Sequence, residues 1–172
     1  MQYKQIVTLI VICFSLFSIS KVHSKDFNNK IIIGSHENIV ILPGELIFDA
    51  KIDTGASNSS MHATDIEFYT QNDGKYVRFK TLDKNDKTII LDLPLHRTAL
   101  IKRHGGESLR RAVVKIGICM ANRYKQVEVT LTDRSKFKSR FLIGTSFLIN
   151  DFIVDVANQN LRKASCNSVT GG

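Results

Sequence analysis

One short stretch of the chain, Ala50 to Ser60, carries residues whose types and order suit acid–base chemistry. It reads AKIDTGASNSS, so an apolar run leads directly into Asp53, Thr54 and Gly55. The polar residues that follow favour a turn, because Ser and Asn side chains compete with the backbone for hydrogen bonds. A strand would therefore carry a carboxylate at its tip, beside a glycine that can adopt backbone angles closed to other residues. The triplet alone is equally compatible with a plain strand followed by a turn that the aspartate caps.

Hydrolysis of a peptide bond by carboxylates needs two of them close together. Two such groups a few ångströms apart cannot both ionise, so one keeps a proton and acts as the acid while the other activates water. The chain has a single Asp-Thr-Gly, and Asp155, which follows the apolar run FIV, lacks the Thr/Ser-Gly that should come next. A symmetric homodimer would supply the second group, because a two-fold axis can bring Asp53 and its copy together.

The sequence shows no pattern typical of a metal or nucleotide site. It contains neither HExxH nor GxxxxGK[ST], and its histidines lack the spacing of a ligand pair. We therefore expect no metal ion and no cofactor. His62, nine residues after Asp53, is a candidate to line a substrate site, and a packed or surface histidine is the alternative.

The charge of the chain suits an anionic partner. The formal net charge is +8 over 172 residues, and the hydrophobic fraction of 43% is ordinary for a globular protein. Such a surface attracts anionic partners: nucleic acid, acidic lipids, polyanionic cell-wall polymers or acidic peptides. The basic residues are scattered, with modest concentrations at 102–111 and 134–140, and no aromatic RNA-binding signature accompanies them. We expect a solvated basic face and no nucleic-acid partner.

The first 24 residues are typical of a secretory signal peptide. Lys4 precedes the apolar run IVTLIVICFSLFSI, and Val22 and Ser24 occupy the −3 and −1 positions of a cleavage site after Ser24. This run is shorter than the about twenty residues that a membrane span needs. We expect a periplasmic or secreted protein that begins near Lys25 and has no stable membrane insertion after cleavage. Loss of Lys4 and Lys21 lowers the net charge from +8 to +6. An uncleaved anchor is the alternative.

Whether the cysteines can form a disulfide depends on export. The mature chain keeps Cys119 and Cys166, and an oxidising compartment would allow a bridge between them. A free, buried Cys119 is the alternative. The length suits one domain with its own core, so we expect a single domain over 25–165 and a flexible tail over 166–172.

The remainder of the chain predicts many short strands. Alternating and β-branched runs are separated by turn signals such as Pro43-Gly44 and Asn72-Asp73-Gly74. Residues 61–69 fit either a helical turn or an extended segment, and residues 94–111 predict a mobile basic loop. This pattern indicates a closed β structure. The expected elements are strands at 30–33, 39–42, 46–53, 76–80, 88–93, 111–120, 126–131, 141–144 and 152–156, and a short helix at 147–150.

Late in the chain, RFLIGTSFL places an apolar-apolar-Gly segment ahead of that short helix. The order DTGA, hairpin, LIG and short helix resembles the order found in retropepsin-type aspartic proteases. The wider pattern is similar to a bacterial family of retropepsin-like proteins named ATP-dependent zinc proteases. The resemblance covers most of 31–156, in the stretches IIIGSHENIVILPG, AKIDTGASNSSMHATDIEFY, DGKYVRF, RRAVVKIGI, VEVTLTDRSKFKSRFLIG and FIVDV.

The resemblance implies an all-β fold, a closed retropepsin-like (acid protease) barrel with one short C-terminal helix. In such a fold, Thr54 and its copy would brace the two aspartates by crossing hydrogen bonds. The late LIG segment would support the loop that holds each aspartate. The site residues implied are catalytic Asp53, Thr54 and Gly55, substrate-binding Ala56, Ser57 and His62, and supporting Leu142, Ile143 and Gly144.

The hairpin Tyr76–Leu93 is the candidate for a flap that closes over a bound peptide and excludes water. The chain departs from the family pattern at two places beside the site. Thr145 stands where an arginine is expected after the late glycine, and the loop Ser57-Asn58-Ser59 is less basic than usual. These differences concern the substrate more than the fold.

Together these features predict an exported aspartic-type endopeptidase that acts on peptide or protein substrates. Its water would be activated by Asp53 carboxylates paired across a homodimer. The alternative is a non-catalytic periplasmic module on the same fold, which would hold a peptide or cell-wall polymer without cutting it.

Overall fold

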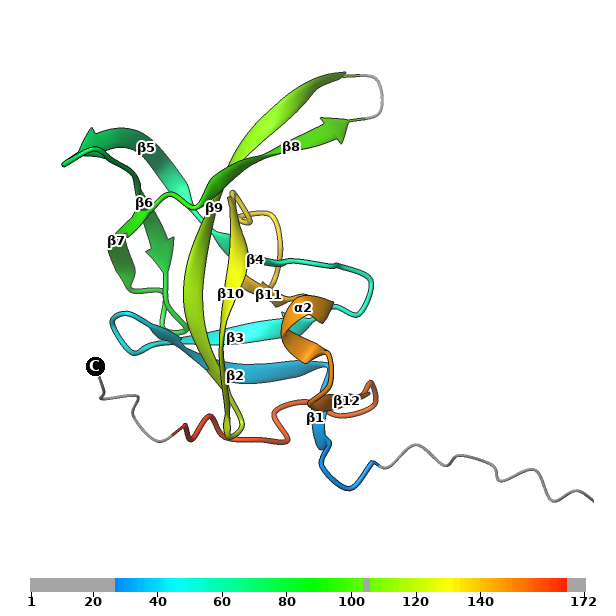
Figure 1. The fold of residues 1–172 in the computed structure, drawn as a ribbon. Helices are drawn as coiled ribbons and strands as arrows, with labels where there is room; N and C mark the ends of the chain where they lie inside the picture. Colours follow the sequence, from blue (N-terminus) through cyan, green and yellow to red (C-terminus); the bar gives the residue numbers. More distant parts are fainter. Residues whose placement is uncertain (1–26, 104–105, 167–172) are drawn as a thin grey trace, which may run out of the picture.

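The computed structural model describes residues 27–103 and 106–166, which form twelve strands and one short helix (Figure 1). The predicted signal peptide over 1–24 lies outside these residues. No helix among them is long and apolar enough to cross a bilayer. The strands are β1 (Ile31–Gly34), β2 (His36–Leu42), β3 (Leu46–Ile52), β4 (Ser59–His62), β5 (Thr64–Gln71), β6 (Gly74–Leu82), β7 (Thr88–Pro94), β8 (Arg97–Arg103), β9 (Gly106–Met120), β10 (Arg123–Thr132), β11 (Phe141–Ile143) and β12 (Phe152–Asp155), and helix α2 (Thr145–Leu148) lies between the last two.

Six of these strands close into a barrel, as the sequence predicted. Their order is β10-β4-β11-β3-β2-β9, and β9 pairs back onto β10 along an antiparallel register that runs from Met120↔Arg123 to Val113↔Thr130. The alternation of buried and outward residues along β2 and β3 explains why these segments are strands with one face in the core. The predicted all-β closed barrel with a short helix is confirmed.

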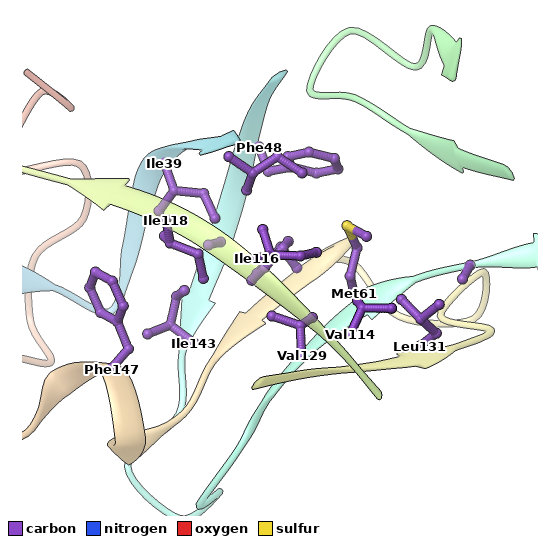
Figure 2. Close-up of a cluster of buried hydrophobic side chains, with 14 of the residues drawn as sticks. Ile39, Phe48, Met61, Val114, Ile116, Ile118, Val129, Leu131, Ile143 and Phe147 are labelled. Carbon is purple, nitrogen blue, oxygen red and sulfur yellow. The ribbon is translucent and has the colours of Figure 1, made fainter. Parts of the chain in front are cut away.

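The barrel interior is filled by apolar side chains from every barrel strand and from α2 (Figure 2). Phe48 and Phe141 pack with their ring centroids 5.6 Å apart, and Phe147 from α2 stacks on Phe152. Full burial of each such side chain contributes about 1.5–3 kcal/mol. The largest fully buried side chains are Phe48, Phe79, Phe141, Phe147, Ile33, Ile39, Ile41, Met61, Ile116, Ile118, Met120 and Leu131.

A separate three-stranded sheet, β5-β6-β7, lies beside the barrel (Figure 1). The predicted hairpin is present as β6 and β7, paired from Tyr76↔Pro94 to Leu82↔Thr88. The segment 61–69, for which a helical turn was one option, is extended and forms the end of β4 and most of β5. Val77 and Phe79 are buried on one face of this sheet, and the other face is largely exposed.

The prediction of a mobile basic loop over 94–111 is wrong for the residues that the structure describes there. β8 and the first half of β9 form an antiparallel hairpin, paired from Arg97↔Val113 to Ile101↔Leu109. The basic residues suggested a loop, but long cationic side chains are tolerated on an exposed strand because their heads remain in water. The short helix also begins earlier than expected, at Thr145 instead of Phe147.

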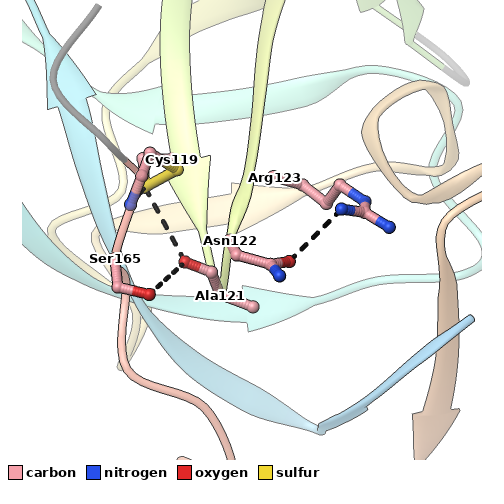
Figure 3. The surroundings of a disulfide bond; sticks show 6 residues. Cys119, Ala121, Asn122, Arg123 and Ser165 are labelled. Atoms are coloured by element: carbon pink, nitrogen blue, oxygen red, sulfur yellow. Dashed lines mark hydrogen bonds between the residues drawn. A yellow bond between two sulfur atoms is a disulfide. The ribbon is translucent and has the colours of Figure 1, made fainter.

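The chain after β12 is fastened to the barrel. The buried Glu37 accepts hydrogen bonds from the backbone N–H groups of Gly34, Leu161 and Arg162, at 2.6, 3.0 and 3.1 Å. Cys119 and Cys166 form a disulfide (Figure 3). The sequence is compatible with either this bridge or a free Cys119, and it predicts a flexible tail that begins at Cys166. Cys166 is instead covalently linked to the end of β9, and the rest of that predicted tail lies outside the described residues.

Candidate active site

Asp53 stands directly after β3, at the tip of a strand that runs through the barrel wall. Its backbone N–H donates to Ile143 O at 2.9 Å, which continues the parallel pairing of β3 with β11. Its Oδ1 accepts a hydrogen bond from Gly55 N at 2.9 Å. That bond draws the chain into a turn, because a short polar side chain that captures a backbone N–H two residues on replaces the strand ladder. The carboxylate is half-buried and its own loop fixes it.

The residues after β11 hold this loop from the other side. Thr145 N donates to Ala56 O at 2.8 Å, and Ser146 N donates to Ser57 O at 3.0 Å. Gly144 N donates to the Ser59 hydroxyl at 3.2 Å. A Cβ on Gly144 would lie 2.6 Å from the backbone of Asn58, so only glycine fits between the two segments. Ile143 and Gly144 thus contact the Asp53 loop, whereas Leu142 pairs with Lys51 and Ser60 in the two strands that flank it.

The predicted site residues around Asp53 differ in their exposure. Thr54, Gly55 and Ser57 are exposed and Ala56 is half-buried. All four belong to the single loop between β3 and β4. They form an accessible edge beside the carboxylate, which is where a substrate or a second copy of the chain could meet it.

His62 does not line an open site. It is buried, and its Nδ1 accepts the backbone N–H of Arg134 at 2.9 Å. Burial lowers the pKa of His62 below its ordinary value of 6.5, and the nearby Arg140 and Arg134 charges act in the same direction. The nearby Asp133 opposes them. A neutral imidazole that accepts a backbone bond has a packing role, so its assignment to substrate binding was wrong.

Arg134 is a component of the site that the sequence analysis missed. Its side chain is only 8% exposed. Nε donates to Ser139 O and Nη1 donates to Ser60 Oγ, both at 3.0 Å, and the guanidinium lies 4.8 Å from the ring centroid of Phe137. Burial lowers the pKa of Arg134, and the neighbouring carboxylate of Asp53 opposes this by raising it. A fixed, desolvated cation therefore lies within electrostatic reach of Asp53.

A second arginine adds to this positive charge. Arg111, on β9, is close enough for its charge to lower the pKa of Arg134. Its Nε is buried and has no hydrogen-bond partner among the described residues. Sequence alone showed a basic concentration at 134–140 and interpreted it as a solvated face. The burial of Arg134 depends on Ser60 and Ser139, and no local pattern reveals such contacts.

Asp155, the other candidate carboxylate in the sequence, accepts hydrogen bonds from residues of its own turn at the end of β12. Its oxygens accept from Ala157 N at 2.9 Å and from Asn158 Nδ2 at 2.7 Å. The Asn158 bond is the main reason why the pKa of Asp155 lies below its ordinary value, and the Ala157 bond adds to it. These bonds are typical of a structural turn residue.

The Tyr76–Leu93 hairpin does not carry its tip to Asp53. Lys84 N donates to Ile47 O at 2.9 Å, and Asp86 lies 3.5 Å from Arg140. Ile47 is six residues before Asp53 on the same strand, a distance of about 20 Å at the rise of a β-strand. The flap prediction is therefore wrong for this tip, which docks at the opposite end of β3.

Within residues 27–103 and 106–166, no group of three or more His, Cys, Asp or Glu side chains is arranged to hold a metal ion. The arrangement around Asp53 consists of one half-buried carboxylate, a braced loop and the buried Arg134, which has Arg111 beside it. Such an arrangement can polarise or activate water if a second acid joins it.

The chain is similar to known proteins over most of its length. Residues 32–165 match the family described as RimB-like, retropepsin-like aspartic endopeptidase RimB. A probable alpha-L-glutamate ligase of Shewanella pealeana is 33% identical over 132 residues, and one of Parasynechococcus marenigrum is 27% identical over 131 residues. These matches cover 74% and 73% of this chain but only 29% and 28% of the relatives, so the chain spans less than a third of their length.

A solved structure has the same fold. The crystal structure of Lpg0085 from Legionella pneumophila, described as a protein of unknown function (DUF785), is 26% identical with a TM-score of 0.66. The match covers 77% of this chain and 98% of that one.

Proposed function

The chain belongs to the RimB-like family of retropepsin-like aspartic endopeptidases, and from that premise we propose that it hydrolyses peptide bonds with two copies of Asp53. The observation that carries the proposal is the braced Asp53-Thr54-Gly55 loop, in which Gly144 packs against the backbone of Asn58. Rigid positioning of a carboxylate is what general acid–base catalysis requires. No metal ion or cofactor takes part in this proposal.

The two carboxylates come from two chains. Paired across a two-fold axis, they share one proton, so one activates water while the other protonates the departing amine. The exposed Thr54 and Gly55 are the parts of the loop that would meet their copies. A homodimer is therefore the active form in this proposal.

An apolar surface next to the loop supports such a dimer. Ile32 on β1 and Ile153 on β12 are cross-strand partners, 47% and 38% exposed, and Val156 just beyond is 82% exposed. β12 follows α2, whose first residue is bonded to Ala56 in the Asp53 loop. The loop between β3 and β4, α2 and the β1–β12 pair lie on the same side of the barrel (Figure 1). Burial of these apolar side chains between two copies would favour association.

The substrate we propose is an acidic peptide. Arg134 contributes buried positive charge near Asp53, and Arg111 lies close to Arg134. Positive charge in this part of the molecule attracts an acidic peptide. The curated relatives are named alpha-L-glutamate ligases, a name that points to glutamate chains as a substrate class. We propose that glutamate-rich peptides are cut in preference to neutral ones.

Export is the remaining element of the proposal. The predicted signal peptide over 1–24 and the Cys119–Cys166 bridge agree with each other, because disulfides persist mainly in oxidising compartments. N-terminal sequencing of protein from its native host should begin near Lys25. An intact Met1 on the soluble protein would contradict export.

The experiment is cleavage of a peptide library by mature, oxidised protein. It should include a glutamate-rich peptide and its glutamine counterpart. Wild type should cut the glutamate peptide faster, with or without a chelator. Asp53→Asn should lose at least about a thousandfold in rate, because it cannot form the carboxylate that activates water. Asp155→Asn is the matched control and should retain most of the activity.

The non-catalytic alternative is an outcome of the same experiment. If wild type binds the glutamate peptide but neither wild type nor Asp53→Asn cuts it, the protein is a binding module on this fold. If both proteins cut it equally fast, the role of Asp53 is wrong.

A further inference from the structure

A basic cleft lies away from the Asp53 loop, where the start of β1, the β9–β10 turn and the C-terminal segment meet. Its volume is about 310 Å³, and its lining includes Lys30, Ala121, Asn122, Arg162, Lys163 and Ser165. Three of these side chains are cationic and none of the lining residues is acidic. The cleft takes no part in the proposed hydrolysis.

The C-terminal wall of the cleft is fastened at both ends. At one end, Arg162 N donates to Glu37 Oε2 at 3.1 Å, and Arg162 Nε donates to Ile32 O at 3.0 Å. At the other end, Ser165 N donates to Ala121 O at 2.6 Å, and the Cys119–Cys166 disulfide lies next to it (Figure 3). The segment that carries Arg162 and Lys163 is therefore held at a fixed distance from the turn. A preorganised wall loses little entropy when it binds a ligand.

The positive charge of this wall is not neutralised by neighbours. Neither Arg162 nor Lys163 forms a salt bridge with a carboxylate in the part of the chain that the structure describes. Glu37 uses its oxygens on backbone N–H groups. Asp151, on which the charge of Lys30 also acts, is 2.5 Å from Lys125 and 3.5 Å from Arg123. The Lys30 ammonium donates to Asn150 O.

We propose that this cleft binds a phosphate group. The Arg162 guanidinium keeps terminal N–H groups beyond its Nε bond, and such a fork suits phosphate oxygens, while Lys163 adds a point charge. The phosphate can belong to free phosphate or to an anionic lipid headgroup.

The first test is a titration of the mature, oxidised protein with inorganic phosphate at constant ionic strength, followed by backbone amide NMR shifts. Saturable shifts confined to Asn122 and residues 162–165 are expected. The double variant Arg162→Gln, Lys163→Gln should weaken binding about tenfold. The double variant Lys75→Gln, Lys87→Gln removes the same charge from the β6–β7 hairpin and should bind as wild type does. The single variant Lys163→Gln, at an exposed side chain, should lose part of the affinity without any risk to folding.

Three results would overturn the proposal: no saturable shift, equal weakening in both double variants, or full affinity in the Lys163→Gln protein. Vesicles with and without an anionic phospholipid separate the two sources. If the wild type binds anionic vesicles better than the Arg162→Gln, Lys163→Gln protein does, the headgroup is a ligand. Equal vesicle binding, together with saturable phosphate binding, assigns the cleft to free phosphate. Because no peptide is cut in these tests, their outcome is independent of the proposed hydrolysis.

Discussion

The Asp53 loop and the three-stranded sheet β5-β6-β7 are stabilised in different ways. Around Asp53, backbone groups from β11 and α2 bond directly to the loop, and glycine is required at the closest approach. On the outward face of the sheet, the contacts are exposed ion pairs: Arg78 with Asp92 at 2.7 Å and Lys80 with Asp65 at 2.8 Å. Exposed pairs contribute little because water and salt screen them.

The fold needs precise geometry at the Asp53 loop more than on the β5-β6-β7 sheet. In the proposed dimer a carboxylate that meets its copy needs a loop that cannot shift, and the backbone hydrogen bonds from β11 and α2 supply that rigidity. The charged side chains of the β5-β6-β7 sheet are exposed to solvent. The Tyr69 hydroxyl and Arg78 both bond to Asp92, which lowers the pKa of Asp92, but all three side chains are on the surface. We expect substitutions at the loop to have much larger effects than matched substitutions on the sheet.

The largest difference is expected between two glycines. In Gly144→Ala the new Cβ meets the Asn58 backbone at 2.6 Å, whereas in Gly74→Ala it meets the edge of the Tyr76 ring at 2.9 Å. A ring edge can rotate away and a braced backbone cannot, so Gly144→Ala should cost about 3 kcal/mol of unfolding free energy. Gly74→Ala should cost much less. Denaturant unfolding of both variants measures this, and equal losses would remove the contrast.

A smaller difference is expected between two arginines. Arg134→Met leaves Ser139 O and Ser60 Oγ without their donor in a buried place, and should cost about 1–3 kcal/mol. Arg78→Met removes a side chain that is 54% exposed and should leave the melting temperature nearly unchanged. Thermal unfolding at low and high salt is the measurement. A loss for Arg78→Met as large as that for Arg134→Met would contradict the account.

Much of the barrel could be predicted from sequence, because its strands alternate with a period of two around Ile39, Ile41 and Phe48. The contact of the late LIG segment with the Asp53 loop was predicted only through the family resemblance. No local sequence pattern indicates a contact between segments so far apart in the chain. The β8–β9 hairpin was missed because its charges were given more weight than its β-forming residues. The buried Arg134 depends on partners distant in sequence, as does the packing of His62.

The smallest expected effect is a pH dependence that comes from His62. Burial lowers its pKa in the folded state, so as pH falls below the ordinary value of 6.5 the unfolded chain takes up a proton first. The contribution of His62 to the unfolding free energy is therefore fully present above pH 6.5 and is lost as the pH falls through the lowered pKa. His62→Asn can still accept the Arg134 N–H bond but cannot titrate. Its unfolding free energy should depend less on pH between 7 and 5, and an unchanged slope would exclude His62 as the cause.

The claim that one site is built from two copies of Asp53 is tested most directly by mixing subunits. Wild type and the inactive Asp53→Asn protein are combined at one to three under conditions that allow exchange, and cleavage of a glutamate-rich peptide is measured per wild-type chain. If each site needs an Asp53 from both chains, random pairing leaves about one quarter of the wild-type chains with an active partner. The specific activity should then fall to about one quarter of that of unmixed wild type. Undiminished activity per wild-type chain, with exchange verified by a tagged subunit, would contradict the shared site.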